Sequence, residues 1–195
     1  MMTTYEETQA FPSHLLLPVQ RIVSIISKDQ LHEPNTDYFR IFVEGEMLII
    51  PSRVYYTEQQ IMECMKLSDI EGTIALCLGT RHHNGYLREK CLIELIKKTP
   101  VPWIIPYIIE LMGEYILPIL QVISRELPNL NTAQFRDFYI ENKPHYSTIC
   151  RRVVSYWNEY YREQYPKWHD YPGYHLIKAF EDAPFNMRAT NSPKS

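Results

Sequence analysis

The sequence has little glycine: six of its 195 residues. Loops that hold phosphate groups need closely spaced glycines, because backbone N–H groups must approach the anion without a Cβ in the way. The chain contains none of the patterns G-x-x-x-x-G-K-[ST], G-x-G-x-x-G, G-x-S-x-G or H-E-x-x-H. These absences exclude the familiar nucleotide-binding loops, the nucleophile elbow and the HExxH zinc site. We expect no catalytic residue and no cofactor.

Cysteine is also sparse, with four residues at positions 64, 77, 91 and 150 and no C-x-x-C pair. A zinc site needs converging ligands that usually come in two close pairs, and a disulfide framework needs a shorter chain with more cysteine. Each thiol lies in an apolar run, so we expect buried, reduced side chains. Because the N-terminus shows no signal-peptide pattern, the expected location is the cytoplasm.

Neither sign of charge dominates, since 20 basic and 23 acidic residues give a net charge of −3. A protein that tracks a phosphate backbone usually carries a clear basic excess, so the composition argues against a nucleic-acid partner. Apolar residues make up 45% of the chain, which suits one core at this length. We expect one helical domain over 1–181, with N-terminal helices in 11–66 and a repeat region over 68–181. A flexible polar tail follows over 182–195.

One apolar run, residues 101–123, is long enough to cross a bilayer. It contains two carboxylates, Glu110 and Glu114, and each would be costly inside a membrane. Three prolines and Gly113 also divide the run into two pieces. We therefore favour two short buried helices over a membrane span, and expect no membrane association.

Helical spacing of apolar residues predicts an all-α fold. Thr57-x-x-Gln60 and Ser68-x-x-Glu71 have the form of capping boxes, which open helices by satisfying free N–H groups. The expected helices cover 11–28, 61–66, 70–78, 86–98, 103–112, 115–126, 133–140, 146–163 and 174–180.

Residues 38–51 fit two structures. Their apolar residues have helical spacing, yet Glu44-Gly45-Glu46 would also suit the turn of a β-hairpin. We favour the helix, because the segments that follow are helical and a lone hairpin is marginally stable. A small hairpin is the alternative.

Tyrosines recur at positions 86, 115, 146 and 174, each at or just before the start of an apolar run. A unit of about 30 residues that cannot bury its apolar stripe alone is typical of a helical solenoid.

A more specific signal lies in His83-Asn84-Gly85-Tyr86-Leu87-Arg88-Glu89-Lys90-Cys91-Leu92, followed by Pro102-Trp103-Ile104-Ile105-Pro106. It combines a turn, a helix that opens with a hydrophobic–arginine pair, and a proline near the start of the next helix. This arrangement resembles HEAT-like (armadillo-type) helical repeats, best over residues 68–126. The resemblance implies an irregular α-α superhelix that serves as a protein-binding scaffold. The period is shorter than the roughly 40 residues usual for such repeats, and Ile116-Leu117 stand where the second unit should have its arginine.

Two groups of residues could carry chemistry. His82 and His83 are the candidates for a metal site, although the sequence favours an exposed turn in which the two rings point apart. Glu110 needs a partner if it is buried, and Arg88 on the preceding repeat is one candidate.

The C-terminal third is rich in aromatic residues: 13 of the 25 lie between Phe135 and Phe180. Tyr, Trp and Arg are enriched at the energetic centres of protein interfaces. The alternatives are core packing and the stacking of nucleic-acid bases. We expect a protein-binding surface formed by Tyr156, Trp157, Tyr160, Tyr161, Arg162 and Trp168.

Together these observations predict a cytoplasmic helical-repeat protein that acts as a protein–protein interaction module. A regulatory or toxin-neutralising role would suit such a small, mildly acidic binder. The alternative is a nucleic-acid-binding protein or metal-dependent enzyme that uses a HEAT-like concave surface near Arg81, His82 and His83.

Overall fold

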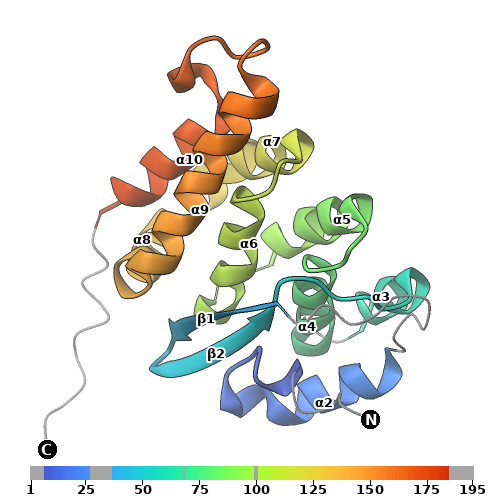
Figure 1. Ribbon diagram of the computed structural model, residues 1–195. Helices are drawn as coiled ribbons and strands as arrows, with labels where there is room; N and C mark the ends of the chain where they lie inside the picture. The colour runs from blue at the N-terminus through green and yellow to red at the C-terminus, as the bar shows by residue number, and fades with distance from the viewer. Residues whose placement is uncertain (1–6, 27–36, 68, 99–100, 185–195) are drawn as a thin grey trace, which may run out of the picture.

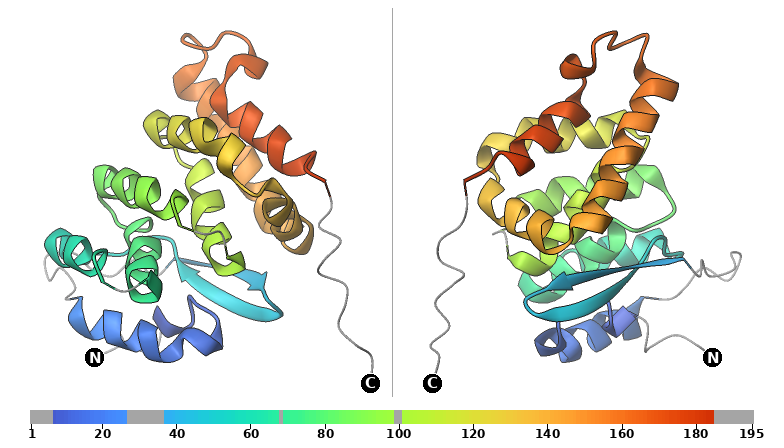
Figure 2. Two further views of the ribbon diagram at one scale, coloured as in Figure 1. Left: turned by 180° about the vertical axis from the view of Figure 1, so that it is seen from behind. Right: turned by 60° about the vertical axis from the view of Figure 1, so that its left-hand side comes forward.

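The computed structural model describes residues 7–26, 37–67, 69–98 and 101–184, which are mostly helical with one two-stranded antiparallel sheet. Figure 1 shows the helices following one another from α2 at one end of the molecule to α9 and α10 at the other. The two views of Figure 2 show the same order. The helical elements are η1 (Ser13–Leu15), α2 (Leu16–Ile25), α3 (Glu58–Cys64), α4 (Asp69–Gly79), α5 (Gly85–Ile96), η2 (Pro102–Ile104), α6 (Ile105–Met112), α7 (Leu117–Glu126), η3 (Leu127–Asn129), α8 (Thr132–Glu141), α9 (Lys143–Tyr156), η4 (Trp157–Tyr161), η5 (Trp168–Asp170) and α10 (Pro172–Glu181).

Outside residues 38–51, each helix expected from the sequence has a counterpart among these elements, so the mostly helical class is confirmed. Thr57 is the residue that precedes α3, the position that the first capping box predicts, but its side chain makes no capping hydrogen bond to the helix. Ser68 of the second box lies outside the described residues, and so does the expected polar tail from residue 185 onward.

Residues 38–51 form a hairpin of β1 (Tyr38–Val43) and β2 (Glu46–Pro51), so the helix expected there is wrong and the alternative is confirmed. Glu44 and Gly45 at its turn have positive φ angles of 54° and 79°. Two such residues make the tight turn that matches the twist of antiparallel strands. Ile41 pairs with Leu48, and both are buried against the helices. The hairpin is therefore stabilised by packing against the helices, which gives it a buried face.

Asn142, between α8 and α9, attaches the hairpin to the helices. Its Oδ1 accepts the N–H of Phe42 at 2.7 Å and its Nδ2 donates to the Phe42 carbonyl at 2.8 Å. The side chain thus pairs with the outer edge of β1 as a neighbouring strand would. Because Asn142 is buried, these bonds also satisfy polar groups that water does not reach.

The apolar run 101–123 divides into η2, α6 and α7, with residues 113–116 between α6 and α7. All eight residues of α6 are buried. Across the described part of the chain, no helix has the length and apolar character needed to cross a membrane. The run is instead the centre of the core, and it carries Glu110 and Glu114 inside the protein.

Gly79 allows helices α4 and α5 to pack closely, because it has no side chain at their contact. A Cβ added to Gly79 would lie 2.3 Å from the Sγ of Cys91, a separation that no real pair of atoms tolerates. Cys64, Cys77 and Cys91 are buried, as expected, whereas Cys150 is only partly buried. Burial raises the pKa of the Cys91 thiol to about 12, which keeps it protonated.

The four tyrosines of the sequence repeat lie near helix starts, but their surroundings differ. Tyr86 and Tyr115 are exposed, Tyr174 is half-buried and Tyr146 is buried. The regular spacing therefore does not place the four rings in one recurring contact.

Candidate functional site

The long helix α9 ends in a cluster of aromatic side chains. Beyond Tyr156 the backbone widens into the π-helical turn η4, a local geometry often found at functional sites. The chain then returns through η5 and α10, which brings Trp168 beside Trp157. We call residues 156–171, together with Tyr115, the aromatic end; it lies at the top of Figure 1.

The inner layer of the aromatic end is packed. The rings of Trp157 and Trp168 have centroids 5.2 Å apart, and Trp157 Nε1 donates to the carbonyl of Tyr165 at 2.9 Å. Tyr161 stacks on the buried Tyr171 at 5.7 Å. Three of the predicted partner-binding residues, Trp157, Tyr161 and Trp168, are therefore half-buried parts of the support.

Tyr161 also connects the aromatic end to the start of α7. Its hydroxyl donates to the carbonyl oxygen of Tyr115 and accepts the N–H of Leu117, 3.3 Å away. Both bonds hold the 113–116 loop, so they fix the backbone that carries the Tyr115 ring.

The outer layer consists of three tyrosines whose rings contact one another in edge or tilted arrangements: Tyr115, Tyr156 and Tyr160. Their centroids are 6.1 Å apart for 115–156, 6.3 Å for 115–160 and 6.1 Å for 156–160. Tyr115 is 56% exposed and Tyr160 is 60% exposed. We call this group the tyrosine triad. Arg162 lies on Trp157 instead, with its guanidinium 5.4 Å from the centre of that ring.

A buried ion cluster lies beneath Tyr115. Glu114 Oε1 accepts Arg81 Nη2 at 2.7 Å and lies 3.1 Å from Arg53 Nη1, while Oε2 accepts Arg88 Nε at 2.8 Å. Arg88 also donates to the carbonyls of His82 and His83. Glu114 therefore points into the protein and Tyr115, the next residue, points out of it.

Glu110 has different partners. It accepts Arg152 Nη1 at 2.8 Å and its other oxygen lies 3.0 Å from His145 Nε2. The expected pairing of Glu110 with Arg88 is therefore wrong, because Arg88 on α5 bonds instead to Glu114, which lies four residues after Glu110, just beyond the end of α6. Burial by itself would raise the pKa of Glu110, but the hydrogen bond from His145 and the charges of Arg81 and Arg152 outweigh it, so the pKa lies below its usual range.

His82 is fully buried, so the exposed turn expected for the histidine pair is wrong. Its Nδ1 accepts the N–H of Asn84 at 3.1 Å, and its Nε2 lies 2.9 Å from the carbonyl of Tyr56, to which it donates. These bonds suit a neutral ring, and burial also favours the neutral form because it lowers the pKa of His82. The rings of His82 and His83 do not point apart, since their centroids are 4.2 Å apart. Nowhere in the described ranges do three or more His, Cys, Asp or Glu side chains form a group that could hold a metal ion.

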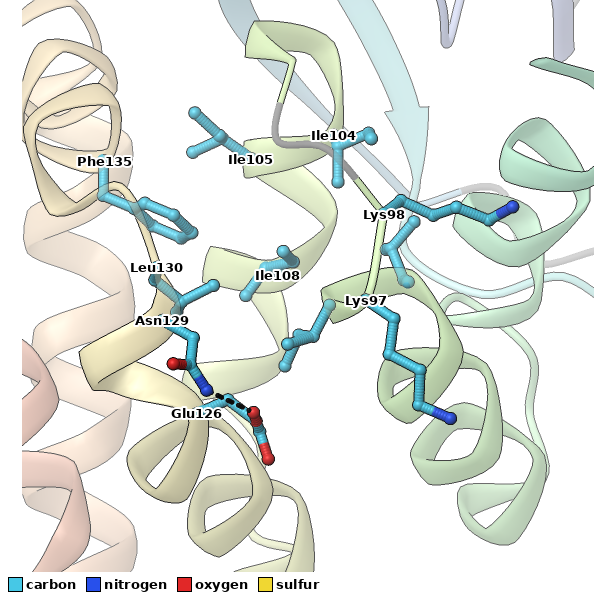
Figure 3. Close-up of a pocket in the computed structure, with 11 residues that line it drawn as sticks. Lys97, Lys98, Ile104, Ile105, Ile108, Glu126, Asn129, Leu130 and Phe135 are labelled. Atoms are coloured by element: carbon cyan, nitrogen blue, oxygen red, sulfur yellow. Dashed lines mark hydrogen bonds between the residues drawn. The ribbon is translucent and has the colours of Figure 1, made fainter. Parts of the chain in front are cut away.

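A cavity of about 420 Å³ lies on another face, between the end of α5 and the segment from α7 to α8 (Figure 3). Ile104, Ile105 and Ile108 form its apolar wall, with Phe135 and Leu130 on one side and the end of α5 on the other. The amine of Lys97 points away from this wall and pairs with Glu94 at 2.7 Å. The size suits a small molecule, but Lys97 pairs with Glu94 and Asn129 donates to Glu126, so these polar groups are already bound to other side chains.

Sequence reasoning missed Tyr115 as a member of the site. Its place in the tyrosine repeat was the signal that singled it out, but nothing local placed it beside Tyr156 and Tyr160. The ion cluster was missed for the same reason, because Arg53 and Glu114 lie far apart in the chain.

The chain was compared with protein-family models, with curated proteins and with solved structures, and none of them matches it.

Proposed function

We propose that this chain is a HEAT-like helical-repeat module that binds another protein through its aromatic end. The resemblance over residues 68–126 and the succession of packed helices support the repeat class, and such repeats are mainly protein-binding scaffolds.

The observation that carries the proposal is an exposed layer of rings on a packed aromatic base. Tyr115 and Tyr160 keep more than half of their surface in water although each contacts other rings. Tyrosine offers a large, stiff contact area at low entropic cost, and rigid aromatic anchors dominate the energy of many interfaces. Because Tyr161 and the inner layer hold the rings in place, less ordering is required when a partner binds.

Affinity capture with the purified chain as bait tests the proposal, using wild type, Tyr160→Ala and Leu17→Ala. Leu17 is a matched control, because it is an exposed apolar residue on α2 at the far end of the molecule. A partner held by wild type and by Leu17→Ala but lost with Tyr160→Ala is the expected result, with all three variants melting at similar temperatures.

Two outcomes would contradict the proposal. One is a partner that binds Tyr160→Ala as well as wild type. The other is specific binding of DNA or RNA, measured by salt titration, that Tyr160→Ala abolishes, because the aromatic end would then be a base-stacking surface.

A further inference from the structure

We propose that the tyrosine triad is a cup for a cationic side chain, and that the partner docks by placing a lysine or arginine on it. This inference rests on the proposed function for the identity of the partner, but the binding chemistry belongs to the triad itself.

The geometry of the triad suits a cation. The three centroid distances, 6.1, 6.3 and 6.1 Å, are nearly equal, so a group above the middle of the triangle is equally close to all three rings. The ring planes are inclined to one another by 68°, 48° and 33°, so the three rings do not lie flat on one another as a stack. A cation within about 6 Å of a ring centroid is attracted by the negative face of the ring.

The aromatic end already holds one cation in this way. The guanidinium of Arg162 lies 5.4 Å from the centre of the Trp157 ring. Among the residues that the structure describes, this is the one cation placed over a ring, so none of these cations lies on the triad.

The neighbouring charges of the chain do not compete for the cup. Arg152, one helical turn before Tyr156, is held on Glu110 at 2.8 Å. Arg53, beneath Tyr115, is held on Glu114 at 3.1 Å. Both guanidiniums are therefore bound to carboxylates inside the protein, although Arg53 shares Glu114 with Arg81 and Arg88. The exposed charge next to Tyr160 in the chain is Glu159, which attracts a cation.

The test uses tetramethylammonium chloride as the probe and follows the tyrosine ring protons by NMR. Neopentyl alcohol is the neutral control of similar shape, and sodium chloride controls for ionic strength. We expect saturable shifts of the triad resonances with tetramethylammonium and none with either control. Equal binding of the neutral alcohol would overturn the inference, because the triad would then be a plain apolar surface. The absence of any saturable shift would overturn it as well.

Two variants at position 160 distinguish the contribution of the aromatic face to binding from the contribution of side-chain size. Tyr160→Phe keeps an aromatic face and should bind the probe within about twofold of wild type, whereas Tyr160→Leu should weaken binding roughly three- to thirtyfold. Equal weakening by both would overturn the inference, because the hydroxyl rather than the ring face would carry the binding.

The result is distinguishable from failure of the proposed function. If binding of a protein partner depends on Tyr160 but tetramethylammonium does not bind the triad, the cation site is refuted and the docking surface stands. If the probe binds and no protein depends on Tyr160, the proposed function fails while the cup stands.

Discussion

Removing the charge of Glu114 should destabilise the protein more than any change at a surface ion pair. Glu114 is the acceptor shared by three guanidiniums, at 2.7, 2.8 and 3.1 Å. Of these three arginines, Arg81 depends most on Glu114 to compensate its charge, because its side chain is 0% exposed. Within the described residues, its Nε and Nη1 have no acceptor, so the bond from Nη2 to Glu114 is what compensates its charge.

The magnitude follows from this dependence. In Glu114→Gln the amide retains one oxygen, but its NH₂ group faces a guanidinium donor and the buried positive charges lose their counter-charge. Breaking a buried pair from one side costs about 3–5 kcal/mol. At about 2–4 °C per kcal/mol for a chain of this size, the melting temperature should fall by roughly 6–20 °C. Glu114→Ala should cost at least as much, because no acceptor remains.

Urea unfolding and thermal melting of wild type, Glu114→Gln and Glu94→Gln measure the effect. Glu94 pairs with Lys97 on the surface, with side-chain exposures of 45% and 62%, so its replacement should leave stability almost unchanged. If Glu114→Gln unfolds no earlier than Glu94→Gln, the ion cluster is not the support that its geometry indicates.

Three further changes test other parts of the structure. Folding lowers the pKa of Glu110, so its contribution to stability is present above its unfolded pKa of about 4.3 and is lost as pH falls. In urea titrations, the difference in unfolding free energy between wild type and Glu110→Gln should therefore shrink between pH 6 and pH 3. A constant difference would refute this. Asn142→Ala leaves the N–H and carbonyl of Phe42 without their partner, so urea unfolding should show a loss of about 2 kcal/mol; an unchanged midpoint would show that water replaces the side chain. Gly79→Ala meets the Sγ of Cys91 and should cost about 1–3 kcal/mol by the same assay, and less in a Cys91→Ala background; equal costs in both backgrounds would place the strain elsewhere.

The helices were predictable because their signals are local. Apolar spacing and breaker residues act within a few positions of the chain. Gly113 and the prolines of 101–123 divided an apolar run into two helices in the sequence, and the structure has that break. The buried state of Cys64, Cys77 and Cys91 follows from the same patterns.

The hairpin could not be settled locally. The apolar residues of 38–51 fit a helix and a pair of strands alike, and the choice depends on what lies beside them. Asn142, about 100 residues away, bonds the edge of β1. Packing against the helices then gives the hairpin a buried face, which a lone pair of strands lacks.

The candidate site shows the same division between local and distant causes. The sequence by itself determined that the last third would be aromatic, that Glu110 would need a partner if buried, and where most helices begin and end. Tertiary structure alone decided that Glu114 pairs with Arg81 and Arg88, that His82 is inside, and that Tyr115 lies beside Tyr156 and Tyr160. The physical reason is that ion pairs and ring contacts depend on distances in space, and these are set only when helices from different parts of the chain have packed.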